Sequence, residues 1–229
     1  MEVISKRELR HGAGLLCDQQ IMHLCHETGM IEPFVAEQVR HVYRDGEPVH
    51  WAFANNLTEA DHTTGSVRRV VSFGLSSYGY DLRAGDEWLV FDSMAMGVVD
   101  PKQFDDELLR PARVVQGEHG RYITMPGNSY ALGASLEHFN MPPDVLGVAV
   151  GKSTYARCGV LVNVTPLEPG WRGHLTIEVS NASPRPARIY LGEGLLQVQF
   201  WRGVPPLTTY ADRAGKYQDQ PNEPVTARL

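Results

Sequence analysis

The residues between positions 151 and 178 carry the side chains best suited to chemistry in this chain. Residues 151–157 read Gly-Lys-Ser-Thr-Tyr-Ala-Arg, so two cations and two small hydroxyls follow a glycine. Glycine lets the backbone approach a ligand closely, and hydroxyl and cationic groups suit phosphate oxygens. Glu178 follows in a short apolar run, and a shielded carboxylate can take and return protons near neutral pH. These residue types could hold a polyphosphate and move protons beside it, which indicates an enzyme.

Each of these features also has a purely structural interpretation. Gly-Lys-Ser is common in surface turns, and Leu146 stands where a P-loop needs its first glycine, five residues before Gly151. Alternation along residues 175–178 puts Thr176 and Glu178 on the same face of an expected strand. A glutamate on such a face is most often exposed to water. The residues alone leave both interpretations open.

Histidine and cysteine residues form no pattern typical of a metal site. His23, Cys25 and His26 lie in one expected helix, but no second cluster completes a set of ligands. The chain also lacks the His-x-Glu and Pro-Cys-x-x-Cys motifs of the zinc-dependent nucleobase deaminases. We therefore expect no zinc and no metal ligands among the side chains.

Composition limits the kind of protein and its partners. The chain has 229 residues, 42% hydrophobic and 21% charged, which is typical of one globular domain. No apolar run reaches the roughly 18 residues of a membrane span, and no signal peptide is evident, so we expect a cytoplasmic protein without a membrane partner. Three cysteines predict reduced thiols. A net charge of −6 argues against broad binding of nucleic acid but allows a local basic pocket for a small anion.

The elements that must position the candidate residues are mostly short strands. Beyond about residue 75, runs of β-branched and aromatic residues are separated by Gly, Pro, Asn and Asp, a pattern that predicts an antiparallel sandwich or barrel. The expected strands are 88–91, 121–124, 130–132, 145–150, 160–164, 175–179, 187–191 and 195–201.

Three other segments differ from this pattern. Residues 19–28 predict a short helix with Asp18 as its N-cap and Gly29 as its end. Residues 32–75 are irregular and polar, and we interpret them as an insertion. The polar, proline-interrupted tail at 212–229 predicts a mobile arm of the kind that closes over active sites.

Several blocks, taken in order, resemble the deoxycytidine triphosphate (dCTP) deaminase branch of the trimeric deoxyuridine triphosphatase (dUTPase) superfamily. The blocks are residues 16–21, 76–83, 125–137, 141–146, 151–157, 168–173, 176–178, 194–197 and 216–220. The resemblance implies a single domain over residues 1–229, mainly β, with a dUTPase-like distorted β-barrel, a few short helices and a mobile C-terminal arm. It also implies a homotrimer with active sites shared between subunits.

The resemblance further implies a role for each matching residue. Glu178 is the implied general base and acid for hydrolytic removal of the cytosine 4-amino group, which converts dCTP to dUTP and ammonia. The resemblance implies that Ser153 and Arg157 bind the water and polarise the site. Both are also implied to contact the nucleotide. The other implied nucleotide-binding residues are Lys152, Thr154, Glu168, Thr176, Ile177, Gln197, Tyr210, Lys216 and Gln220. Mg²⁺ is implied as a companion of the nucleotide, held through the triphosphate and waters.

The chain departs from the family pattern close to the implied chemistry. Asn163 stands where these deaminases usually carry histidine, and the loop after residue 164 is shorter than in the deaminase pattern, with Pro166 inside it. Retention of the three implied catalytic residues favours a deaminase. The departures keep two alternatives open: a dUTP or dCTP diphosphatase, alone or coupled to deamination, and a catalytically silent nucleotide-binding homologue.

Overall fold

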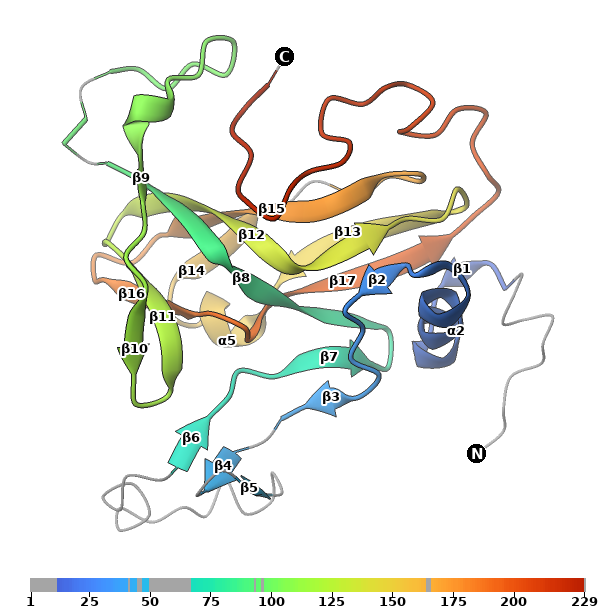
Figure 1. Ribbon diagram of the computed structural model, residues 1–229, viewed down its shortest axis with the longest axis horizontal. Coiled ribbons are helices and arrows are strands. Elements are labelled where there is room, and N and C mark those ends of the chain that lie inside the picture. Colours follow the sequence, from blue (N-terminus) through green and yellow to red (C-terminus); the bar gives the residue numbers. More distant parts are fainter. Residues whose placement is uncertain are drawn as a thin grey trace.

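A computed structural model describes residues 12–40, 42–44, 47–49, 67–92, 94–95, 97–163 and 166–228. The central part of the expected insertion, 50–66, and the start of the shortened loop, 164–165, lie outside the described residues. The described chain is mainly β with a few short helices, which confirms the expected fold class (Figure 1).

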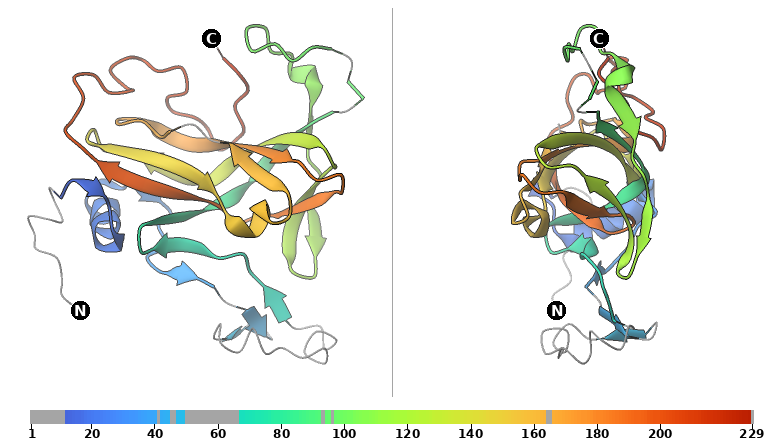
Figure 2. Two further views of the ribbon diagram at one scale, coloured as in Figure 1. Left: turned by 180° about the vertical axis from the view of Figure 1, so that it is seen from behind. Right: turned by 90° about the vertical axis from the view of Figure 1, so that its left-hand side faces the viewer.

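Eleven strands form the main sheet of the described chain, and every pairing between named strands is antiparallel. They are β1 (Gly14–Leu15), β2 (Ile31–Glu32), β3 (Gln38–Val39), β7 (Phe73–Ser76), β8 (Gly79–Phe91), β9 (Leu109–Pro111), β12 (Ser129–Asn140), β13 (Val145–Gly151), β14 (Val160–Asn163), β15 (Arg172–Asn181) and β17 (Gly194–Arg202). The main path runs β1-β17-β8-β12-β15-β14, with β13 on the other side of β17. The strands curl around a shared core, as the right-hand view of Figure 2 shows.

Two small sheets extend from this barrel-like body. The first comprises β10 (Val115–Gly117), β11 (Gly120–Met125) and β16 (Ala187–Tyr190). The second comprises β4 (Val42–Arg44), β5 (Glu47–Val49) and β6 (Val67–Arg69), and it lies within the expected insertion, away from the body in Figure 1. The pairing of β3 with β7, and of β7 with β8, joins this segment to the main sheet.

Several strands are longer than the sequence pattern predicts, β8 and β12 most of all. β8 has 13 residues and β12 has 12, so the expected runs 88–91 and 130–132 are only parts of them. The strands pass through Gly85 and Gly133, where the ladder shifts register. A Cβ atom on Gly133 would lie 2.4 Å from the Trp88 ring, so the missing side chain makes room for that indole. Glycine here allows close packing within a strand instead of ending it.

The expected helix is present as α2 (Asp18–Thr28), and Gly29 ends it with a φ of 64°. The prediction that Asp18 is the N-cap is wrong, because Cys17 occupies that position. The Gln20 side chain folds back to accept a 3.1 Å hydrogen bond from the Cys17 amide, as in a capping box, and so satisfies one of the backbone donors at the start of the helix.

The other helical elements are single turns, α5 (Ser153–Ala156) and the 3₁₀ turn η1 (Asp106–Leu108). Within the part of the chain that the structure describes, no helix has the length and apolar character needed to cross a membrane.

A buried ion pair ties β8 to β12 beyond their register shift. Arg83 Nε lies 2.6 Å from Glu137 Oε1, and the Tyr80 hydroxyl donates to the same oxygen at 3.2 Å. The Glu137 side chain is fully buried. Desolvation raises the pKa of its carboxyl, and the Arg83 charge opposes that rise. A carboxylate in this position depends on its partner.

We predict that Arg83→Ala lowers the free energy of unfolding by about 3 to 5 kcal/mol, because it leaves a buried carboxylate without its cation. Arg121→Ala is the matched control, since it removes an arginine paired with Asp86 at the surface and should cost less than about 1 kcal/mol. Denaturant titration of both variants at one protein concentration measures the difference. Equal losses would contradict the importance of the buried pair.

Candidate active site

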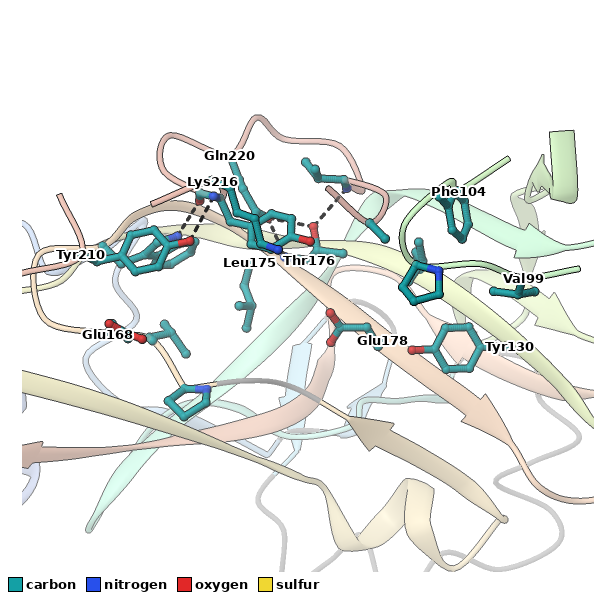
Figure 3. Close-up of a pocket in the computed structure, with 18 of the residues that line it drawn as sticks. Val99, Phe104, Tyr130, Glu168, Leu175, Thr176, Glu178, Tyr210, Lys216 and Gln220 are labelled. Atoms are coloured by element: carbon teal, nitrogen blue, oxygen red, sulfur yellow. Dashed lines mark hydrogen bonds between the residues drawn. The ribbon is translucent and has the colours of Figure 1, made fainter. Parts of the chain in front are cut away.

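A cavity of about 870 Å³ lies between the main sheet and the C-terminal tail (Figure 3). The face of β12 and β15 that lines it is called the cavity face. Aromatic and aliphatic side chains, among them Phe104 and Val99, form one end. Polar side chains, among them Lys216 and Glu168, lie toward the other end, and Glu178 lies between the two. The cavity therefore joins an apolar region to a polar one across a single carboxylate.

Strand β15 places Glu178 in this cavity because the strand is paired on both sides. Glu178 lies opposite Leu132 of β12 and opposite Asn163 of β14. The strand alternation then sends Ile177 into the core, where it is completely buried, while Thr176 lines the cavity. The expected alternation of these residues is therefore observed. The face that carries Thr176 and Glu178 does not lie open to water, as such a face usually does, but lines the cavity.

Burial gives Glu178 the properties of a proton carrier. Desolvation raises the pKa of its carboxyl from 4.5 to about 7, and a backbone hydrogen bond offsets part of the rise. Its Oε2 atom is buried and has no hydrogen-bond partner among the described residues. A carboxyl with this pKa exists in both protonation states at neutral pH, which suits a group that first takes and then returns a proton.

The C-terminal tail is seated on the same strand. Gln220 Oε1 accepts hydrogen bonds from the Thr176 amide at 3.2 Å and from the Thr176 hydroxyl at 2.8 Å. The Val225 amide donates to that hydroxyl at 3.1 Å, and the Val225 side chain is buried. The Trp171 indole donates to the Tyr217 carbonyl at 2.7 Å. The arm expected to be mobile thus lies folded over the cavity of its own chain.

The polar end of the cavity contains three of the residues predicted to bind the nucleotide. Lys216 lies above the Tyr217 ring and donates to the Arg228 carbonyl at 2.6 Å. Tyr210 accepts a hydrogen bond from the Tyr217 amide at 3.0 Å. Glu168 forms an ion pair with Arg213. Lys216 supplies a cation that an anionic group entering the cavity would meet.

The remaining predicted residues lie in a second cluster, around α5 and β17. The Ser153, Thr154 and Arg157 side chains are exposed and do not contribute to the lining of the cavity. Lys152 forms an ion pair with Asp81, a buried residue that the sequence analysis did not single out. Within one described chain, the hydroxyls and cations of residues 151–157 are therefore not brought together with Glu178.

Two partly buried side-chain amides complete the surroundings of Asp81. Asp81 accepts hydrogen bonds from the side chain of Gln197 at 3.1 Å and from that of Gln38 at 2.8 Å. The structure thus places Gln197, predicted to bind the nucleotide, beside Asp81 and away from the cavity. The sequence feature that could have identified Asp81 lies in the segment 76–83, because an aspartate within an apolar strand needs partners for its charge.

Two departures from the family pattern lie at the site, one beside Glu178 and one in the cavity wall. Asn163 is its neighbour across the β14–β15 ladder, and its amide lies 3.4 Å from the Ser180 hydroxyl. Pro166 lines the cavity. Tyr130, a neighbour that the sequence pattern did not identify, also lines it.

Comparison with known proteins gives matches that extend over most of the chain. Residues 54–203 match the family model described as dCTP deaminase-like. A dCTP deaminase of Campylobacter curvus is 46% identical over 208 residues, covering 90% of this chain and 94% of that protein. One of Roseiflexus castenholzii is 47% identical over 204 residues, covering 89% and 93%. A crystal structure of 2′-deoxycytidine 5′-triphosphate deaminase from Agrobacterium tumefaciens matches with 15% identity and a TM-score of 0.49, covering 90% of this chain and 53% of that one.

We predict that burial of Glu178 makes the stability of the protein depend on pH. The folded-state pKa of about 7 lies above 4.5, the ordinary value that applies to the unfolded chain. The contribution of Glu178 to stability is therefore lost as pH rises from about 4.5 to 7 and stays constant above that range. The loss amounts to about 3 kcal/mol. Glu178→Gln should therefore be more stable than wild type by up to about 3 kcal/mol at pH 8, and by less than about 1 kcal/mol at pH 5.

Denaturant titrations of wild type and Glu178→Gln at both pH values test this expectation. Glu118→Gln, at an exposed position, is the control and should change the free energy of unfolding by less than about 0.5 kcal/mol at either pH. A Glu178→Gln variant as stable as wild type at pH 8 would show that burial does not penalise the charge.

Proposed function

The chain belongs to the dCTP deaminase family, and we propose that it hydrolyses dCTP to dUTP and ammonia with Glu178 as the proton carrier. The observation that carries the residue assignment is the raised pKa of this cavity carboxyl, about 7. Its position between the apolar end and the polar end of the cavity suits a base on one side and a triphosphate on the other.

Proton transfers through Glu178 account for the reaction. Its carboxylate takes a proton from a water whose oxygen attacks C4 of the cytosine ring, and the proton passes to N3. In the second half, Glu178 takes the proton of the new C4 hydroxyl and delivers it to the amino group. The bond between C4 and that nitrogen then breaks as the C4 oxygen becomes a carbonyl, and ammonia leaves. A carboxyl that titrates near neutral pH serves both halves, because neither protonation state is strongly disfavoured.

The polar end of the cavity supports a site for the phosphates. Lys216 is a flexible cation on the tail, and Gln220 anchors the tail beside it through Thr176. We assign Tyr210 and Glu168, at the same end, to the triphosphate and the sugar. Mg²⁺ fits this site only as a companion of the phosphates, since the described residues contain no group of three or more acidic, histidine or cysteine side chains arranged for a metal.

We further propose a homotrimer in which the segment 151–157 of one subunit completes the cavity of another. Support comes from the exposure of Ser153, Thr154 and Arg157, which carry the remaining hydroxyls and the guanidinium but do not line the cavity of their own chain. An exposed cluster of this kind can serve a neighbouring subunit. In that arrangement Arg157 and Ser153 polarise the water and the base. A cytoplasmic location suits an enzyme of free nucleotides.

We predict that Glu178→Gln abolishes deamination while dCTP binding persists. The amide keeps the size of the side chain but cannot accept the proton, so turnover should fall by a factor of at least 10² to 10⁴. Separation of the products of dCTP with Mg²⁺, together with an ammonia assay, measures it. Pyrophosphate release from dCTP without ammonia in wild type would instead indicate the diphosphatase. Binding of dCTP without any product would indicate a silent homologue.

Mixed oligomers test the shared site. Glu178→Gln and Ser153→Ala should each be inactive alone, but subunits unfolded together and reassembled in equal amounts should recover roughly a quarter of wild-type turnover. The recovery arises because about one site in four combines an intact Glu178 with an intact Ser153 from different chains. Each variant reassembled with itself is the control. No recovery in the mixture would contradict a site built from two subunits.

A further inference from the structure

Tyr130, on β12, lies next to Glu178 on the cavity face of the sheet. Leu132 pairs with Glu178 and Tyr130 pairs with Ser180, so Tyr130 and Glu178 are diagonal neighbours across one strand pair. Figure 3 shows the Tyr130 hydroxyl pointing toward the Glu178 carboxylate. The phenol and the carboxylate therefore face each other within the cavity.

Aromatic packing fixes the direction of this hydroxyl. The Phe91 ring meets the Tyr130 ring edge-on, with centroids 5.5 Å apart and an angle of 77° between the planes. Phe104 packs edge-on against Phe91 in turn, with centroids 6.2 Å apart. These rings belong to β8 and to the segment before η1, so two separate parts of the chain hold the phenol in place.

Among the described residues that line the apolar side of the cavity, Tyr130 carries a hydrogen-bond donor that can serve Glu178. Of the described residues that line this side, Phe91, Val99, Phe104 and Leu132 carry no polar side-chain atom. Across the ladder on β14, Asn163 is uncharged, and its amide lies beside Ser180. The ionisable groups elsewhere in the lining belong to the polar end and the tail, and they are Glu168, Tyr210, Lys216 and Tyr217.

The protonation state of Tyr130 suits it to donate. Burial and the nearby Glu178 charge raise the pKa of its phenol to about 12, so the hydroxyl keeps its proton throughout the range in which Glu178 titrates. The Oε2 atom of Glu178 is buried and has no hydrogen-bond partner among the described residues. A fixed donor and a vacant acceptor therefore share one wall of the cavity.

We propose that Tyr130 is a positioning residue whose hydroxyl reaches Glu178 Oε2 through one bridging water molecule, to which it donates a hydrogen bond. The inference rests on the proposed function, because it concerns the reaction only if Glu178 carries the proton. A hydrogen bond to the ionised carboxyl favours that form and so opposes the effect of burial. It also commits one carboxylate oxygen to Tyr130 and leaves the other free to take the proton of the attacking water.

Tyr130→Phe tests this role, because it removes the hydroxyl and keeps the ring between its aromatic neighbours. The acid limb of kcat/KM for dCTP should move to higher pH by about one pH unit, the effect of losing a hydrogen bond to a charged group. At pH values below the wild-type limb, kcat/KM of the variant should be about tenfold lower than that of wild type. Above pH 8 it should recover toward the wild-type value. A loss of the same factor at every pH would indicate a merely structural role and overturn the inference.

Two further variants separate the possible failures. Tyr122→Phe makes the same change on β11, where the ring packs against Tyr190, and its acid limb should coincide with that of wild type. Glu178→Gln tests the premise: wild-type turnover in this variant would overturn the proposed function itself. An inactive Glu178→Gln together with an unshifted Tyr130→Phe profile would overturn only the assignment of Tyr130.

Discussion

Glu178 is held against an apolar wall with one carboxylate oxygen unpartnered, an arrangement that costs free energy which the rest of the fold must offset. The offset comes from where the residue sits. β15 lies between β12 and β14, so its backbone is paired on both sides, and its alternate residues Ile177 and Val179 are fully buried in the core. A peripheral strand or a loop could rearrange to bring the carboxylate into water. A doubly paired strand cannot do so without breaking two ladders.

The same reasoning distinguishes Glu178 from two of the buried carboxylates, Asp81 and Glu137. Asp81 is met by the ammonium of Lys152 and by two side-chain amides, and Glu137 is met by Arg83 and a tyrosine hydroxyl. In those two places the fold supplies a partner for the charge, as buried charges ordinarily require. At Glu178 it supplies apolar walls. That contrast within one chain supports the proposed role of Glu178, because a raised pKa is useful to a proton carrier and only costly to a structural residue.

Much of this could be predicted from the sequence, for reasons visible in particular residues. Local patterns correctly predicted the short helix ending at Gly29 and the mainly antiparallel β class. They also predicted the alternation that puts Glu178 and Ile177 on opposite faces of the strand. The resemblance correctly predicted the family, as the near-complete matches confirm. The partner of Lys152 could not be predicted, because Asp81 lies 71 residues away in the sequence. Tyr130 was missed for the same reason: only the register of two strands distant in the sequence makes it a neighbour of Glu178.

The seating of the tail bears directly on the chemistry of Glu178. Gln220 is bonded to the backbone and hydroxyl of Thr176, two positions before Glu178 on one strand, and Val225 is buried beside it. Tail side chains form part of the cavity wall, so they contribute to keeping water from the carboxylate. If the tail lifts, water gains access to the cavity and the pKa of Glu178 falls toward its ordinary value. A tail that closes would therefore create the electrostatic surroundings that the proposed role of Glu178, first as base and then as acid, requires.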